Sequence, residues 1–112
     1  MVSPTIGSVV LVPFPFSDLS ASKLRPALVV AESSRGDWVC VQITSNPYSD
    51  SKAITLAAED FVQGGLDRIS YVRPGKLFTA SEIIFRRSVA NVSTQKLAAI
   101  IEAIVSLLQD RG

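Results

Sequence analysis

The chain contains no histidine and only one cysteine, Cys40, among its 112 residues. A lone cysteine cannot form a disulfide within the chain, and without histidine a metal ion would depend mainly on carboxylates. We find no spaced carboxylate cluster in the sequence, so it predicts neither a metal site nor a bound cofactor. The missing histidine also excludes catalysis by a pair of histidines that titrate near neutral pH.

Long apolar runs are absent too. The longest are far shorter than a membrane-spanning helix requires, and Pro4 and Gly7 interrupt any signal-peptide pattern at the start. The single cysteine is compatible with a reducing compartment. We therefore expect a cytoplasmic protein that does not associate with membranes. Its length fits one domain, residues 1–112, with room for a real core.

The formal net charge of +1 argues neither for nor against a nucleic-acid partner. Its distribution is more informative, because five cations fall within twenty residues and only Asp67 and Glu82 oppose them there. These cations are Arg68, Arg73, Lys76, Arg86 and Arg87. Such a patch could contact a phosphate backbone. A solvated surface of mixed charges explains the same pattern equally well.

The first four-fifths of the chain consists of short strand-like runs separated by turn residues, which is typical of a small barrel. The predicted strands cover 9–14, 27–31, 38–44, 53–57 and 69–72. Turns are predicted at 35–37, 46–47 and 64–65, and Pro74-Gly75 is predicted to stop the fifth strand. A polar loop is predicted at 17–22, and 80–87 is ambiguous, with a short helical turn as one interpretation.

The last element is a predicted amphipathic helix from Ser93 to about Gln109. Ser93 is a favourable N-cap residue. Six apolar residues recur at helical spacing and form a broad stripe that we expect to pack on the barrel. They are Leu97, Ile100, Ile101, Ile104, Val105 and Leu108.

Side chains alternate along the predicted third strand. Val39, Val41 and Ile43 point to one face and are the better core candidates. Trp38, Cys40, Gln42 and Thr44 point to the other face. This alternation places Thr44 on the more polar face, where a substrate could reach it. Cys40 is interpreted as a small buried side chain and Trp38 as a packing residue.

Two hydrogen-bonding residues stand at the ends of neighbouring predicted strands. Arg25 precedes Pro26, which favours an extended backbone for the arginine. A guanidinium held on a stiff backbone offers a planar fork of donors to a phosphate. Thr44 closes the later strand. A simpler role for Arg25 is that of a strand-entry residue paired with Glu32 or Asp37.

Several motifs follow one another along nearly the whole chain. They are Gly7-Ser8-Val9-Val10-Leu11-Val12-Pro13-Phe14, Arg25-Pro26-Ala27-Leu28-Val29-Val30, Ile43-Thr44-Ser45-Asn46, Asp67-Arg68-Ile69-Ser70-Tyr71-Val72, Lys76-Leu77-Phe78-Thr79 and the closing helix. In this order the chain resembles the MazF/PemK family of bacterial toxin endoribonucleases. The resemblance implies a mainly β fold with a helix: an SH3-like barrel of the MazF/Kid/CcdB type with a C-terminal amphipathic helix.

The resemblance also implies an activity. The toxin of a type II toxin–antitoxin system would cleave single-stranded RNA, such as mRNA, sequence-selectively and without a metal ion. Attack by the 2′-hydroxyl would leave 2′,3′-cyclic phosphate and 5′-hydroxyl ends. The implied partners are a second copy of the chain, with the RNA groove along the dimer interface, and a cognate antitoxin whose tail occupies that groove. DNA binding would come through the antitoxin complex.

The family's catalytic pair corresponds here to Arg25 and Thr44. Lys23 and Ser45 are candidates for catalytic support, with Lys23 as one hypothesis for the group that carries a proton. Asp18 is another nearby titratable group. The candidate RNA-binding residues are Ser22, Lys23, Asn46, Arg73, Lys76 and Thr79.

The chain departs from the family pattern at two places. Residues 18–23 replace the usual Gly-Ser-Glu-Gln-type loop, and Phe78 stands where arginine is common. Two other functions fit the same fold: a CcdB-like toxin that inhibits gyrase, and a non-catalytic barrel that binds RNA or a peptide. Tyr48 is a candidate for stacking on a base in any RNA-binding reading.

Overall fold

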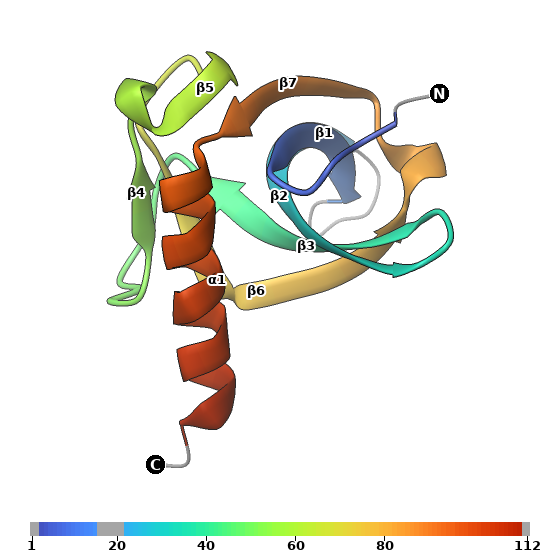
Figure 1. Ribbon diagram of the computed structural model, residues 1–112. Helices are drawn as coiled ribbons and strands as arrows, with labels where there is room; N and C mark the ends of the chain where they lie inside the picture. The colour runs from blue at the N-terminus through green and yellow to red at the C-terminus, as the bar shows by residue number, and fades with distance from the viewer. Residues whose placement is uncertain (1–2, 16–21, 111–112) are drawn as a thin grey trace.

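A computed structural model describes residues 3–15 and 22–110. Seven strands form one antiparallel sheet that curls into a half-barrel, and a single α-helix packs beside it (Figure 1). The strands are β1 (Ser8–Pro15), β2 (Ser22–Ser34), β3 (Asp37–Thr44), β4 (Ile54–Leu56), β5 (Phe61–Gly64), β6 (Ser70–Ser81) and β7 (Arg87–Val92), and the helix is α1 (Thr94–Gln109). Two 3₁₀ turns cover Ala58–Asp60 and Glu82–Ile84. The predicted barrel with a C-terminal helix is confirmed.

The strand order across the sheet is β4-β6-β3-β2-β1-β7-β5. The first three strands therefore pair in chain order, and the turn at Arg35 and Gly36 joins β2 to β3, as predicted. The glycine has a φ of +80°, which the missing Cβ permits. Strand β7 returns to the free side of β1 and carries β5 on its outer edge.

Both faces of the curled sheet bury apolar side chains. One core lies against the helix and includes Val41 and Ile43, with Val39 packed beside it. The other core contains Cys40, with Trp38 packed against it. The predicted alternation along β3 is thus correct, and Cys40 is buried and Trp38 packed, as expected. The face that Thr44 shares with them is more apolar than expected, because the curled sheet encloses it as well.

Strand β6 continues through Pro74 and Gly75, where the sequence predicted a stop. Its pairing with β3 changes register between Val41↔Leu77 and Ile43↔Val72, so several β6 residues bulge opposite Gln42. A bulge accommodates proline because the bulged residues are left out of the ladder. Pro74 is fully buried there.

Strands β5 and β7 are absent from the sequence prediction. Gly64, predicted as a turn residue, is the last residue of β5 and pairs with Ala90 of β7. A Cβ at Gly64 would lie 2.1 Å from the carbonyl oxygen of Val89, and its φ is +66°. Only glycine allows the two backbones to approach this closely. The short helical turn expected within 80–87 is confined to Glu82–Ile84.

The helix begins where the sequence predicted. The Ser93 hydroxyl accepts a hydrogen bond from the Lys96 amide at 3.1 Å, which caps α1. Ile100 and Ile104 are buried against the sheet, whereas the outer part of the apolar stripe, including Val105 and Leu108, is exposed. Among the described residues, no helix is long and apolar enough to cross a membrane.

Candidate active site

A cavity of about 290 Å³ opens where β2 begins and β3 ends. It brings together four of the residues singled out from the sequence: Lys23, Arg25, Thr44 and Ser45. The other lining residues are Leu24, Pro26, Ile43, Leu66, Asp67, Arg68 and Ser70. The pair Arg25 and Thr44, nineteen residues apart in sequence, thus shares one cavity.

Strand pairing explains why these two residues meet. Strands β2 and β3 pair with the register Ala27↔Gln42. Continuing that antiparallel register by two residues on each strand brings Arg25 opposite Thr44, with both side chains on the same face. The pairing of β2 with β3 begins just after Pro26, which has no N–H to donate. The start of β2 and the end of β3 are therefore not joined by the backbone hydrogen bonds of the β2–β3 ladder, and the cavity lies there.

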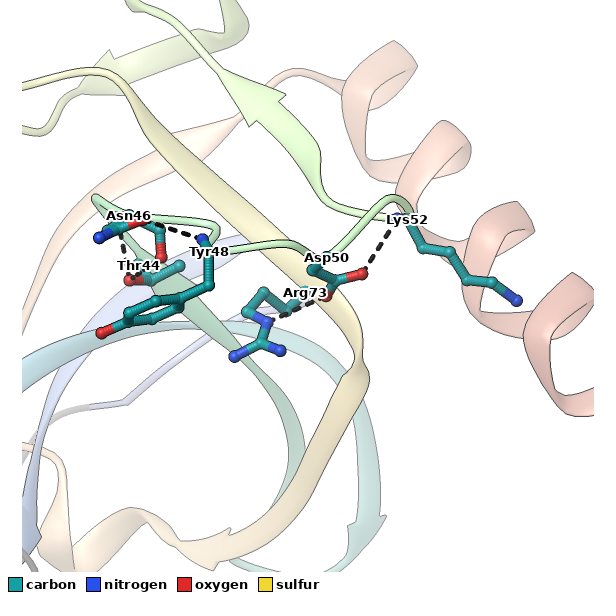
Figure 2. Close-up of polar contacts among 6 residues, drawn as sticks. All are labelled: Thr44, Asn46, Tyr48, Asp50, Lys52 and Arg73. Atoms are coloured by element: carbon teal, nitrogen blue, oxygen red, sulfur yellow. Dashed lines mark hydrogen bonds and ion pairs between the residues drawn. The ribbon is translucent and has the colours of Figure 1, made fainter.

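Thr44 is buried, with 8% of its surface exposed. Its hydroxyl donates to the carbonyl oxygen of Asn46 at 3.0 Å and accepts from the Asn46 amide at 3.1 Å. Figure 2 shows this closed contact at the start of the loop after β3. The hydroxyl is thereby held in one position, and it must release the Asn46 carbonyl to donate to a ligand.

The charge of the cavity is predominantly positive. Lys23, Arg25 and Arg68 contribute cations, and Asp67 is the one carboxylate that the described residues bring to the lining. The Ser70 hydroxyl donates to the Arg68 carbonyl oxygen at 3.1 Å, which fixes the backbone that carries the second guanidinium. Three cations around one small cavity suit a phosphate group.

A second cavity, of about 520 Å³, adjoins β3 on the same face. It is lined by Gln42, Arg73, Lys76, Leu77 and Phe78. Gln42 lies two residues before Thr44, so their side chains share one face of the strand, about 7 Å apart along it. The bulge of β6 supplies the cations of this cavity. An extended, negatively charged ligand could follow β3 from one cavity to the other.

A third cavity, of about 420 Å³, lies between β5 and β7 and is lined by Gln63, Gly64, Ser88, Val89, Ala90 and Asn91. Among the described residues its lining includes no charged side chain, and none of the site residues predicted from the sequence contributes to it. It is therefore a weaker candidate than the cationic cavity at Arg25.

Arg73 belongs to a polar cluster that continues from Thr44 along the loop (Figure 2). Its Nε donates to a carboxylate oxygen of Asp50 at 2.9 Å. This hydrogen bond, with help from the Lys52 backbone amide, holds the pKa of Asp50 below its usual value. The Arg73 guanidinium carbon also lies 5.9 Å from the centre of the Tyr48 ring. Arg73 is therefore held in place from two sides.

The remaining predicted residues are placed differently. The Asn46 side chain accepts from the Tyr48 amide at 2.9 Å and so shapes the loop. Thr79 pairs with Val39, whose face is the one opposite to Thr44, and it lines neither cationic cavity. Ser22 is the first residue of β2, and Asp18 and the rest of the predicted loop up to residue 21 lie outside the described residues.

The sequence interpretation missed three lining residues, Gln42, Asp67 and Arg68, as members of the site. In the sequence Arg68 belongs to a basic patch and to the motif at 67–72, neither of which marks it as a site residue. The patch is divided in the structure: Arg68 lines the cavity of Arg25, whereas Arg73 and Lys76 line the second cavity. Asp67 and Arg68 come close to Arg25 because they lead into β6, which pairs with β3 as far as Thr44. No local sequence pattern carries that information.

The alternative partners of Arg25 lie elsewhere. Glu32 and Asp37 flank the turn at the opposite end of the β2–β3 hairpin. Cys40 is buried, and its burial raises the pKa of the thiol to about 11. Within residues 3–15 and 22–110, no three acidic or cysteine side chains gather as a metal ion would need. The described residues of the site offer donors that suit a phosphate.

The comparisons with known proteins agree with this fold. Residues 5–108 match the model of a family described as "PemK-like, MazF-like toxin of type II toxin-antitoxin system". None of the curated proteins compared matches the sequence.

Several solved structures, in contrast, align with nearly the whole chain. A mycobacterial endoribonuclease in complex with its cognate antitoxin aligns with TM-score 0.73 and 18% identity, covering 98% of this chain and 99% of that one. MazE-MazF from Deinococcus radiodurans aligns with TM-score 0.72 and 21% identity over 96% and 98% of the two chains. The Mycobacterium tuberculosis toxin MazF-mt6 aligns with TM-score 0.66 and 16% identity, covering 92% of this chain and 99% of that one. At these identities the similarity establishes the fold.

Proposed function

The chain belongs to the PemK-like, MazF-like toxin family of type II toxin–antitoxin systems, and from this we propose that it is a metal-independent endoribonuclease acting on single-stranded RNA. The observation that carries the proposal is the shared cavity of Arg25 and Thr44, with Lys23 and Arg68 beside them. A cationic cavity with a hydroxyl in its wall offers the donors that a phosphodiester requires.

In the proposed reaction, the ribose 2′-hydroxyl attacks the adjacent phosphorus. A bond forms between that oxygen and phosphorus, and the bond from phosphorus to the 5′-oxygen of the next nucleotide breaks. The products carry a 2′,3′-cyclic phosphate and a 5′-hydroxyl. Arg25 binds the non-bridging oxygens and stabilises the charge that grows on them, and Thr44 donates to the same group. A hydrogen bond to a charged group contributes about 1.5–3 kcal/mol.

Proton transfer needs a different group, because arginine stays protonated in nearly every environment. Lys23 and Ser45 line the cavity and are the proposed support for this step. Lys23→Met tests the lysine directly: loss of activity with a changed pH–rate profile supports its role as a proton carrier. Full activity with an unchanged profile eliminates it.

The proposal extends to partners. Solved relatives include an endoribonuclease in complex with its cognate antitoxin. We propose that this chain is likewise neutralised by an antitoxin, which covers the two cationic cavities, and that it acts in the cytoplasm. The exposed apolar residues Ile101, Val105 and Leu108 on α1 are available for association, and we propose a homodimer. A monomeric mass in light scattering at micromolar concentration would refute the dimer.

The test is incubation of the purified protein with a long single-stranded RNA in excess EDTA. Arg25→Ala removes the proposed phosphate clamp. Arg35→Ala is the matched control, because Arg35 is exposed on the turn at the far end of the same hairpin. We expect discrete fragments with 5′-hydroxyl ends from the wild type and from Arg35→Ala, and none from Arg25→Ala.

Cleavage by all three proteins would identify a contaminating nuclease and leave the proposal without support. Intact RNA from folded wild type, on several RNAs of different sequence, would overturn the nuclease and make inhibition of gyrase supercoiling the next assay. RNA binding without any cleavage would assign the barrel a binding role only.

A further inference from the structure

Tyr48 is placed in an unusual way on the loop that follows Thr44. Its backbone φ is +57°, and it is the only residue other than glycine with a positive φ in the part of the chain that the structure describes. Its side chain is 73% exposed and contributes nothing to either core. A bulky residue in this backbone region is disfavoured, and an exposed ring gains little from burial. Its placement is therefore not explained by packing.

Hydrogen bonds within the loop hold the backbone of Tyr48 in place. Its amide donates to the Asn46 side-chain oxygen at 2.9 Å, and the Asn46 backbone is in turn bound to the Thr44 hydroxyl. Thr44, Asn46 and Tyr48 thus form one connected series of hydrogen bonds along the loop (Figure 2). Four residues span at most about 14 Å, so the Cα of Tyr48 lies within that distance of the Cα of Thr44, which lines the cavity.

Arg73 supports the ring from β6. Its guanidinium carbon lies 5.9 Å from the ring centre, and its Nε is bound to Asp50, so the cation under the ring is itself held in position. A cation beside an aromatic ring is attracted to the π electrons of that ring. The same guanidinium lines the second cavity, beside Lys76. The ring is therefore linked to both cationic cavities, to the second through Arg73 and to the first through the loop that begins after Thr44.

We propose that Tyr48 is a base-binding platform, on which the base of a nucleotide close to the scissile phosphate stacks. The inference rests on the proposed RNA substrate and adds a residue that binds the base at one position near the cut, whichever base stands there. The Thr44–Asn46–Tyr48 series fixes the distance between the phosphate site and the stacked base. Stacking of a base on an aromatic side chain contributes roughly a 5- to 150-fold gain in affinity.

Two substitutions separate the ring from the backbone. Tyr48→Phe keeps the ring and serves as the matched control. Tyr48→Asn removes the ring but suits the positive φ, because asparagine tolerates this region better than other residues with a Cβ. The loop should therefore keep its shape in Tyr48→Asn, which circular dichroism and urea unfolding verify.

Cut sites are mapped on one long RNA for the three proteins. We expect Tyr48→Phe to match the wild type. Tyr48→Asn should cleave the wild-type sites roughly 5- to 150-fold more slowly, because the stacking contact is lost whichever base stands there. Equal rates in Tyr48→Asn and the wild type would overturn the proposal, and so would a loss of rate in Tyr48→Phe as large as that in Tyr48→Asn.

A binding arm separates this inference from the nuclease proposal. Fluorescent 2′-O-methyl hexanucleotides of A, C, G and U lack the nucleophilic hydroxyl and remain intact. If the wild type cleaves no RNA, a five-fold or larger loss of hexanucleotide affinity in Tyr48→Asn, absent from Tyr48→Phe, still supports the platform while the nuclease fails. Equal affinity of all three proteins overturns the platform, whether or not the wild type cleaves RNA.

Discussion

Replacing Thr44 with valine keeps the size and branching of the side chain but removes its hydroxyl. In the structure that hydroxyl makes two hydrogen bonds to the Asn46 backbone, at 3.0 and 3.1 Å. Each contributes about 0.5–1.5 kcal/mol to stability, so Thr44→Val should lower the free energy of unfolding by about 1–3 kcal/mol. The methyl groups of valine fill the same space, so no cavity contributes to this loss.

The same change should affect cleavage more strongly than stability. Loss of one donor to a group that gains charge in the transition state typically costs about 10²–10³ in rate. Urea unfolding measures the first effect as a lower midpoint with an unchanged slope, and fragment yield in EDTA measures the second. Thr44→Ser is the control, because it keeps the hydroxyl and should retain most of the activity.

Wild-type stability and wild-type cleavage in Thr44→Val would refute the reasoning on both counts. A stability loss as large as expected, with cleavage unchanged in the remaining folded protein, would assign Thr44 to the loop structure alone and leave Arg25 as the one proposed catalytic residue.

Three further predictions follow from particular contacts. Ser93→Ala should lower the free energy of unfolding by about 1 kcal/mol in urea, whereas Ser93→Asp should not, because the Lys96 amide needs an acceptor at the cap; equal stability of both would contradict the cap. Cys40, buried and with its pKa raised to about 11, should resist iodoacetamide at pH 8 until urea unfolds the chain, as followed by mass spectrometry, and rapid labelling of the folded protein would contradict its burial. The hydrogen bond from Arg73 lowers the pKa of Asp50 in the folded protein below 3.8, its value in the unfolded chain. The ionised Asp50 therefore stabilises the fold fully above pH 3.8, and this contribution is lost as the pH falls through the lower pKa of the folded state. Asp50→Asn should therefore be less stable than wild type at pH 7, with the difference shrinking in acid, and a pH-independent difference would contradict the ion pair.

The elements with strong local signals were predictable from the sequence. The helix follows from apolar spacing and from the cap at Ser93, both of which are properties of neighbouring residues. The first three strands are apolar runs bounded by turns. Strand β5 is short, lies at an edge and ends in Gly64, and such strands form through pairing with distant partners rather than through local preference.

Proline and glycine account for the clearest misreading of the sequence. Pro74 and Gly75 normally end a strand, and the sequence gives no sign that the opposite strand leaves room for a bulge. The bulge matters for function, because it carries Arg73 and Lys76 toward the face of β3 that also bears Gln42.

The candidate site was predictable in part. Arg25 and Thr44 stand out through a resemblance of motifs, and the register of β2 with β3 then explains their proximity. Arg68 joins them only through the tertiary path of the chain into β6. The contact between Tyr48 and Arg73 likewise depends on a loop conformation with positive φ, and a tyrosine in the sequence does not predict such a conformation.

The most direct measurement uses an RNA oligonucleotide that contains one mapped cut site, incubated with wild-type protein in excess EDTA. A second oligonucleotide carries a single 2′-deoxynucleotide immediately 5′ of the scissile phosphate. We expect the all-ribose strand to be cut, with 2′,3′-cyclic phosphate and 5′-hydroxyl ends, and the substituted strand to stay intact. Cutting of the substituted strand at the same phosphate, or products with 5′-phosphate ends, would contradict attack by the 2′-hydroxyl at the site of Arg25 and Thr44.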